Sequence, residues 1–289
     1  MTSPALPYIR TYDGIRAGAV GLVMLSHWPF GHWQLPLGWV GVQVFFVLSG
    51  LLITRLLVAD RDRPLGGFLR RFYWRRTLRI FPLYFFYLLL IGGGVLLAAR
   101  WPELAAVRTV SAGNLFIRAD GGWLATYLYN WQDVSHWFMS SATTPAIRLF
   151  DHLWSLSVEE QFYLVFPLIV WAVPPAQLRW LLWSLVLGAP LVRSVVGELV
   201  RAIPAPPQAW PFFLTRATIF YLDALAIGGL LALGLGQGLA HPGRWLVGAL
   251  LVGAGLNILG QAAAIVELGH PWPSWRWLGY EHPLRLHRI

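Results

Sequence analysis

Long apolar stretches dominate the chain, and short polar segments separate them. A helix needs about 20 mostly apolar residues to cross a bilayer, and eight stretches meet or approach that length. They cover residues 14–30, 37–59, 80–99, 112–129, 152–173, 178–200, 213–235 and 245–266. The pattern therefore predicts an all-α fold, a polytopic transmembrane helical bundle of about eight spans.

The stretch 112–129 is the weakest of these, because Arg118 and Asp120 interrupt it. Charges in hydrocarbon are costly, so the segment either spans within the bundle or is re-entrant. If it spans, helix alternation places the C-terminal arginines on the same side as the N-terminus, in agreement with the positive-inside bias. We predict that it spans.

Composition also indicates a membrane protein. Of the 289 residues, 57% are hydrophobic and 12% charged, and the mean hydropathy is +0.56, whereas soluble domains are about 25% charged. All 22 basic residues are arginines, but no soluble module carries a basic stripe, so nucleic acid is not a predicted partner. The absence of cysteine excludes disulfide and thiolate chemistry. Because no small-residue cleavage site follows the first apolar run, that span is predicted to remain uncleaved.

Seven arginines lie between the second and third predicted spans, in the segment 60–79, which we predict to be a short loop. Such a basic loop predicts that it and the N-terminus are cytoplasmic, in a multi-pass protein of the cell membrane. Arg75 and Arg76 lie four and three residues before Arg79, so the three arginines crowd one side of a helical entry into the third span. Two interpretations stay open, namely topogenic charge that binds lipid headgroups and a cradle for a polyphosphate.

The first span contains three ionisable residues, Asp13, Arg16 and His27. Arg16 and His27 are eleven residues apart, so on a helix they share a face about 16 Å apart along the axis. They are candidate functional groups, because charges inside a membrane need partners. The alternatives are a snorkelling Asp13–Arg16 pair at the membrane edge and a histidine in an interfacial aromatic belt.

The fifth span begins with adjacent carboxylates, Glu159 and Glu160. Neighbours on a helix point about 100° apart, so the two cannot serve one site in the same way. Both need Arg or His partners in a membrane. Helical spacing places His152, Ser155, Glu159 and Tyr163 on one stripe, and Ser157, Glu160, Gln161 and Leu164 on another.

Two other spans carry polar or small residues that need an explanation. In the second span, Gly38, Gly41 and Gly50 predict close packing against the first span, and Ser49 needs a polar partner. In the seventh, Arg216 and Asp223 predict an ion pair with another helix.

Five motifs, in this order, resemble the acyltransferase-3 family of integral membrane acyltransferases. They are YDGIRAGAV followed by His27, then GVQVFFVLSGLLITRLL, FYWRRTLRIFPLY, HLWSLSVEEQFYLVFPL and RATIFYLDALAIGGLLA. The resemblance covers about residues 12–233. It implies that residues 1–289 form a single integral membrane acyltransferase domain. It also implies transfer of an acyl group, usually acetyl, from cytoplasmic acyl-CoA to a hydroxyl of a surface carbohydrate or glycolipid, without a metal.

The resemblance also implies roles for individual residues. The family's R-x10-H pattern falls on Arg16 and His27, and His27 is the predicted catalytic histidine, either as the base of a direct transfer or as the carrier in a covalent acyl-histidine relay. Its S-x-x-E pattern falls on Ser157 and Glu160, and Glu160 or Asp13 is predicted to orient the imidazole. Its R-x-x-R pattern falls on Arg76 and Arg79. The predicted binding residues for the CoA moiety are Arg75, Arg76, Arg79 and Ser157.

The chain has fewer predicted spans than is usual in the family, so the last C-terminal spans are predicted to be missing. It is then a short form, a form that needs a partner, or an inactive truncated member. A membrane transporter or flippase for a glycolipid or polar solute is the alternative from another functional class, although no internal repeat supports it.

Overall fold

The computed structural model describes residues 10–27, 38–105, 107–132, 150, 152–201, 216–235 and 248. Within these ranges the chain is helical, with turns and no strand, which confirms the predicted all-α fold. The elements are α1 (Arg10–His27), α2 (Gly38–Asp60), α3 (Leu65–Tyr87), the π-helical η1 (Leu88–Gly92), α4 (Gly93–Ala98), α5 (Pro102–Ala105), α6 (Arg108–Ala125), α8 (Leu153–Ala172), α9 (Pro175–Arg201), the 3-10 helix η2 (Thr218–Tyr221) and α11 (Leu222–Leu235).

Four of the described helices are long and apolar enough to cross a membrane. They are Gly38–Asp60, Leu65–Ala98, Leu153–Ala172 and Pro175–Gly197, and they match the second, third, fifth and sixth predicted spans. The first and fourth predicted spans are helical as α1 and α6, and the described part of the seventh contains a shorter apolar helix. The eighth, 245–266, lies outside the described residues except for residue 248. The total of eight stays a prediction.

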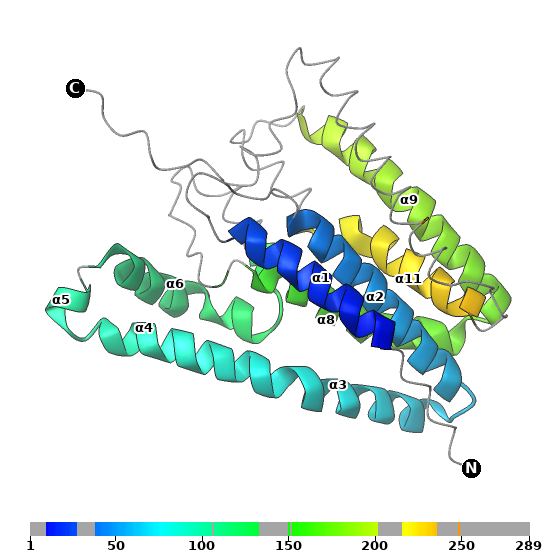
Figure 1. Cartoon of the computed structure of the whole chain (residues 1–289), viewed down its shortest axis with the longest axis horizontal. Helices are drawn as coiled ribbons and strands as arrows, with labels where there is room; N and C mark the ends of the chain where they lie inside the picture. The colour runs from blue at the N-terminus through cyan, green and yellow to red at the C-terminus, as the bar shows by residue number, and fades with distance from the viewer. Residues whose placement is uncertain are drawn as a thin grey trace.

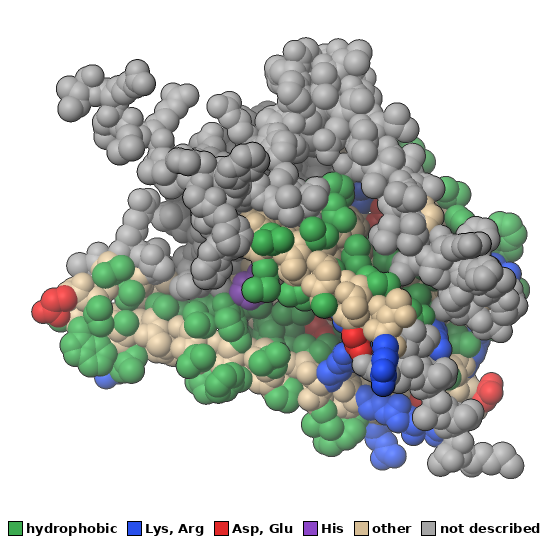
Figure 2. Space-filling view, viewed as in Figure 1, with side chains coloured by type: hydrophobic (Ala, Val, Ile, Leu, Met, Phe, Trp, Pro, Cys, Tyr) green, Lys and Arg blue, Asp and Glu red, His purple; other side chains and the backbone are tan. Residues whose placement is uncertain are grey.

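The basic segment 60–79 is not a loop, contrary to the prediction. Pro64 has an extended backbone with ψ 142°, and α3 begins at the next residue, so most of the arginines lie on this helix. Arginine and leucine have high helix propensity, and the proline ends the preceding turn, so a helix can begin directly after it. The continuous helix from Leu65 to Ala98 has 34 residues, or about 51 Å, whereas the hydrocarbon core is about 30 Å thick. The basic first turns therefore extend beyond the apolar part, and Figure 2 shows arginine side chains gathered at this end of the molecule.

Helix α2 lies at the centre of the bundle, between α1, α8 and α11 (Figure 1). Glycines allow this packing: a Cβ on Gly41 would lie 2.5 Å from the carbonyl oxygen of Ala19, and one on Gly50 would lie 2.0 Å from that of Leu225. The prediction of close packing against the first span is thus confirmed at Gly41, and also at Gly38, where an added Cβ would clash with Ser26 of α1. At Gly50 the close neighbour is α11 instead.

Ion pairs fix two other contacts. Asp60, at the end of α2, pairs with the Nε atoms of Arg63 and Arg71, each at 2.9 Å. Asp223 on α11 pairs with Arg193 on α9 at 3.3 Å, which confirms the predicted pairing with another helix for Asp223. The guanidinium of Arg216, the other residue of that prediction, lies 4.9 Å from the ring centroid of Trp154 on α8.

A half-buried polar cluster centres on Gln161 of α8. Its amide nitrogen donates to the carbonyl oxygen of Tyr127 at 2.9 Å and to Oδ1 of Asn130 at 2.8 Å. Its amide oxygen accepts hydrogen bonds from Nε1 of Trp131 at 3.0 Å and Oγ1 of Thr218 at 2.5 Å. The cluster ties α8 to the segment after α6 and to η2, next to the two glutamates.

Candidate functional site

Glu159 joins α2 to α8. Oγ of Ser49 on α2 donates to Oε1 of Glu159 at 2.6 Å, and the hydroxyl of Tyr163, one helical turn along α8, donates to Oε2 at 3.0 Å. Both carboxylate oxygens are therefore engaged within the protein. This hydrogen bond gives the hydroxyl of Ser49 the polar partner that the sequence analysis predicted it to need.

Arg76 brings positive charge from α3 to the same place. Its guanidinium lies over the ring of Tyr163, 4.7 Å from the ring centroid. The side chain is half-buried and is attracted electrostatically by both Glu159 and Glu160. Arg16 of α1 also attracts Glu159. Charged groups from α1, α3 and α8 therefore meet beside α2, as expected for ionisable groups in a membrane bundle.

Glu160 differs from Glu159 in its unused hydrogen-bonding capacity. Its Oε1 atom is buried and has no hydrogen-bond partner among the described residues. The carboxyl group interacts electrostatically with Arg76, and also with Tyr84 and Tyr127, whose rings stack with centroids 4.2 Å apart. The hydroxyl of Tyr84 donates to the carbonyl oxygen of Leu124 at 2.8 Å. Glu160 is thus the carboxylate that can still accept a hydrogen bond from a ligand or from another side chain.

The other predicted site residues lie in different environments. Arg75 and Arg79 are exposed on α3. Ser157 is fully buried, and its hydroxyl donates to the carbonyl oxygen of Leu153 in its own helix at 3.2 Å. His27 is the last residue of α1, and its side chain lies outside the described part of the structure.

Asp13 and Arg16 form an ion pair near the start of α1, 3.4 Å apart, with the two side chains partly exposed. No group of three potential metal ligands was found among the described residues.

Sequence reasoning did not select Glu159 as a site residue. The family pattern placed the functional glutamate at residue 160, one position further on. Two signals were nevertheless present, because Glu159 and Tyr163 share a helical stripe and Ser49 is a polar residue inside an apolar span. What the sequence could not provide is the register between α2 and α8, which brings Ser49 to Glu159.

Comparison with known proteins gives the same family as the motifs. The acyltransferase-3 family model, described as an acyltransferase domain, matches residues 9–286. O-acetyltransferase OatA of Staphylococcus aureus (strain NCTC 8325 / PS 47) is 34% identical over 167 residues, which are 56% of this chain and 25% of that protein. Peptidoglycan O-acetyltransferase OatA of Listeria monocytogenes serovar 1/2a is 32% identical over 223 residues, which are 74% of this chain and 32% of that protein. No solved structure is significantly similar.

The matched region thus corresponds to a quarter to a third of the length of these relatives. The family model, in contrast, extends over nearly the whole chain, including all the segments that carry the polar cluster around Glu159 and Glu160. The chain belongs to the acyltransferase-3 family of integral membrane acyltransferases.

Proposed function

We propose that the protein is a membrane O-acyltransferase that moves an acyl group from acyl-CoA to a hydroxyl group of a surface carbohydrate or glycolipid. The family supports acyl transfer, and the names of both relatives support acetyl as the group. The Listeria relative's name supports peptidoglycan as one acceptor. The structural observation that carries the proposal is Glu160, a half-buried side chain whose carboxylate keeps one buried, unpaired oxygen and interacts electrostatically with Arg76.

In the proposed reaction, His27 acts as the general base. Its neutral imidazole takes the proton of the acceptor hydroxyl as that oxygen attacks the thioester carbonyl carbon. The carbon–sulfur bond then breaks, the ester forms, and the imidazolium returns its proton to the CoA thiolate. Glu160 stabilises the imidazolium in this scheme, and Asp13 stays paired with Arg16 near the start of α1.

The arginines of α3 have two different roles toward the acyl-CoA donor. Arg75 and Arg79 are exposed and lie one helical turn apart, so both can hold CoA phosphates at the membrane surface. Arg76 faces inward, over Tyr163. Its position favours a role in stabilising negative charge on the thioester oxygen rather than a phosphate contact. Ser157, whose hydroxyl is bonded within its helix, supports the packing of α8 instead of contacting CoA.

We also propose how the protein is oriented in the membrane. The basic end of α3 faces the cytoplasm, with the N-terminus on that side, because arginine-rich segments are retained there. CoA then binds at the inner surface, and the acceptor reaches His27 from the other end of α1.

The test is acyl transfer by membranes that contain the full chain, incubated with labelled acetyl-CoA and surface polysaccharide. His27→Ala and Glu160→Gln should each reduce labelling by about 10²- to 10⁴-fold, the usual contribution of general acid–base groups. Glu103→Gln, a change of an acidic residue on the short helix α5, serves as a control and should leave labelling unchanged. Full activity of the His27 variant would refute the assignment. Movement of glycolipid without CoA would favour a transporter.

A further inference from the structure

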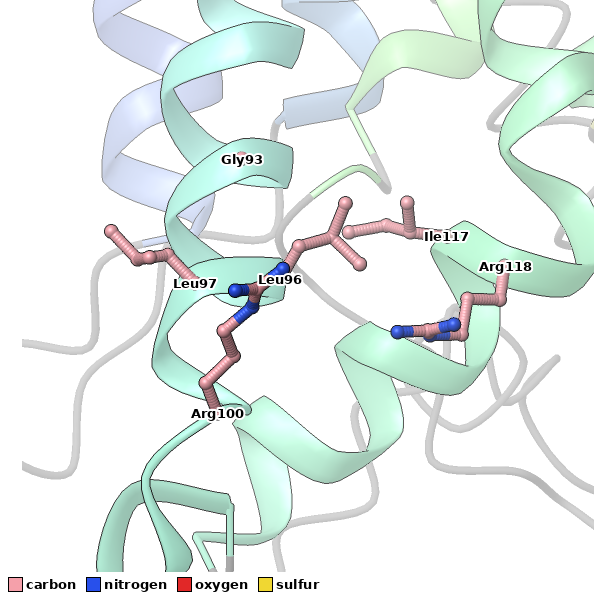
Figure 3. A pocket seen from close by; sticks show the side chains of 6 residues that line it. All are labelled: Gly93, Leu96, Leu97, Arg100, Ile117 and Arg118. Atoms are coloured by element: carbon pink, nitrogen blue, oxygen red, sulfur yellow. The ribbon is translucent and has the colours of Figure 1, made fainter.

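A pocket lies between α4 and α6, away from the cluster around Glu159 and Glu160. Its volume is about 620 Å³, and it is lined by Gly93, Leu96, Leu97, Arg100, Ile117 and Arg118. Figure 3 shows the side chains of Arg100 and Arg118 extending from opposite walls toward the space between the two helices. The pocket therefore combines an apolar wall with two positive charges.

Local packing explains why the space exists. A Cβ on Gly113 of α6 would lie 2.8 Å from Cγ1 of Val95, so α4 and α6 are in close contact there. At Gly93 the opposite holds, because an added Cβ would meet no atom within 4 Å. The helices touch on one side of Val95 and leave an open groove at Gly93.

The charges of this pocket are not balanced by the described side chains. Nε of Arg118 donates to Oδ1 of Asn114 at 2.8 Å, a neutral acceptor on the same helix. Neither Arg100 nor Arg118 forms an ion pair with a described residue. Arg118 lies beside Gly93, which belongs to the membrane-spanning helix Leu65–Ala98. An arginine at such a position requires an anion or water, because hydrocarbon does not solvate it.

We propose that this pocket binds an anionic phospholipid. The phosphate is held between Arg100 and Arg118, for which the planar guanidinium is well suited. A hydrocarbon chain lies along Leu96, Leu97 and Ile117. A lipid fits better than a free phosphate ion because the wall is apolar and because Leu97 is 56% exposed beside a helix that faces the bilayer. The proposal does not depend on acyl transfer.

The test counts lipids retained by the purified full chain in native mass spectrometry, with phosphatidylglycerol or phosphatidylcholine as the probe. Wild type should retain one phosphatidylglycerol that Arg100→Gln and Arg118→Gln each bind about tenfold more weakly, since a hydrogen bond to a charged group contributes about 1.5–3 kcal/mol. Phosphatidylcholine, which has no net charge, should bind equally to all variants. Comparing variants separates this site from lipid bound at the basic end of α3.

Two glycine variants keep the test independent of the arginines. Gly93→Leu places a side chain in the groove, where its Cβ would meet no atom within 4 Å, and should also weaken binding about tenfold, while Gly94→Leu, next in sequence and outside the pocket, should not. Leucine favours a helix over glycine, so neither change is expected to unfold the protein. Equal phosphatidylglycerol binding by wild type and Gly93→Leu would overturn the proposal. Displacement of the lipid by millimolar inorganic phosphate would overturn it as well, because the site would then hold a free anion.

Discussion

Replacing Ser49 and Glu159, singly and together, tests the contact that joins α2 to α8. In the structure Oγ of Ser49 donates to Oε1 of Glu159 at 2.6 Å. Ser49→Ala leaves that oxygen without its donor. Glu159→Gln keeps the shape of the side chain but removes the charge that Ser49, Tyr163 and Arg76 all face.

The expected magnitude follows from the chemistry of the contact. A hydrogen bond to a charged group contributes about 1.5–3 kcal/mol in soluble proteins, whereas double-mutant cycles in a membrane bundle reach only about 1.7 kcal/mol. We therefore expect each single change to lower the free energy of unfolding by about 1–2 kcal/mol. The double variant should lose less than the sum, with a coupling energy of about 1 kcal/mol.

The measurement is unfolding of the full chain in mixed micelles by titration with sodium dodecyl sulfate, followed by tryptophan fluorescence. Ser184→Ala is the matched control, because this serine on α9 is exposed and its hydroxyl bonds only within its own helix. It should change the free energy of unfolding by less than about 0.5 kcal/mol. Strict additivity of the Ser49 and Glu159 changes would refute the contact.

Three other changes test the packing and the polar contacts by the same unfolding measurement. Gly50→Ala should cost about 1–3 kcal/mol, because its Cβ would lie 2.0 Å from a carbonyl oxygen of α11, whereas Gly94→Ala, with open space around it, should gain up to about 1 kcal/mol; equal effects of the two would contradict the close approach. Asp223→Asn should cost about 1 kcal/mol or less, since Arg193 also donates to the carbonyl oxygen of Phe220 and keeps that partner; a loss several times larger would mean that Asp223 is the main partner of Arg193. Gln161→Leu removes four hydrogen bonds at once and should cost at least about 2 kcal/mol; a neutral effect would show that the cluster is not formed.

The apolar pattern was sufficient to predict the four described helices that are long and apolar enough to cross a membrane. Hydrocarbon requires every backbone group to be paired within its own segment, so a run of apolar residues has few structural alternatives. The pattern was less informative for α1 and α6, where Asp13, Arg16 and Arg118 interrupt the apolar run. Whether such a helix spans depends on its neighbours, and the sequence does not contain that information.

The start of α3 shows a different limit. Arginines between two apolar spans were interpreted as a loop because charge marks the cytoplasmic side. Charge, however, determines the side of the membrane and not the backbone conformation, and arginine is a good helix former. The conformational signal in this segment is Pro64, directly after which the helix begins.

The positions of the two glutamates show the limit for the site. Helical geometry correctly indicated that they face different directions and that Glu159 shares a stripe with Tyr163. It could not indicate which carboxylate would be used by the protein itself, since that depends on Ser49, 110 positions away in the chain. Only the packed bundle shows that Glu159 has both oxygens engaged and that Glu160 keeps one unpaired.

The hydrogen bonds of α8 to distant segments determine how the site forms. Glu159 and Gln161 lie on the same helix and each binds a group from a distant segment, Ser49 on α2 and Thr218 in η2. In hydrocarbon an unmatched polar group costs more than in water, so a shift of α8 by one residue breaks both sets of bonds together. The buried apolar side chains of α8, such as Phe162 and Phe166, also resist such a shift, but their contacts lack the directionality of hydrogen bonds. The polar groups therefore fix the register of α8, and through it the position of Glu160 relative to Arg76.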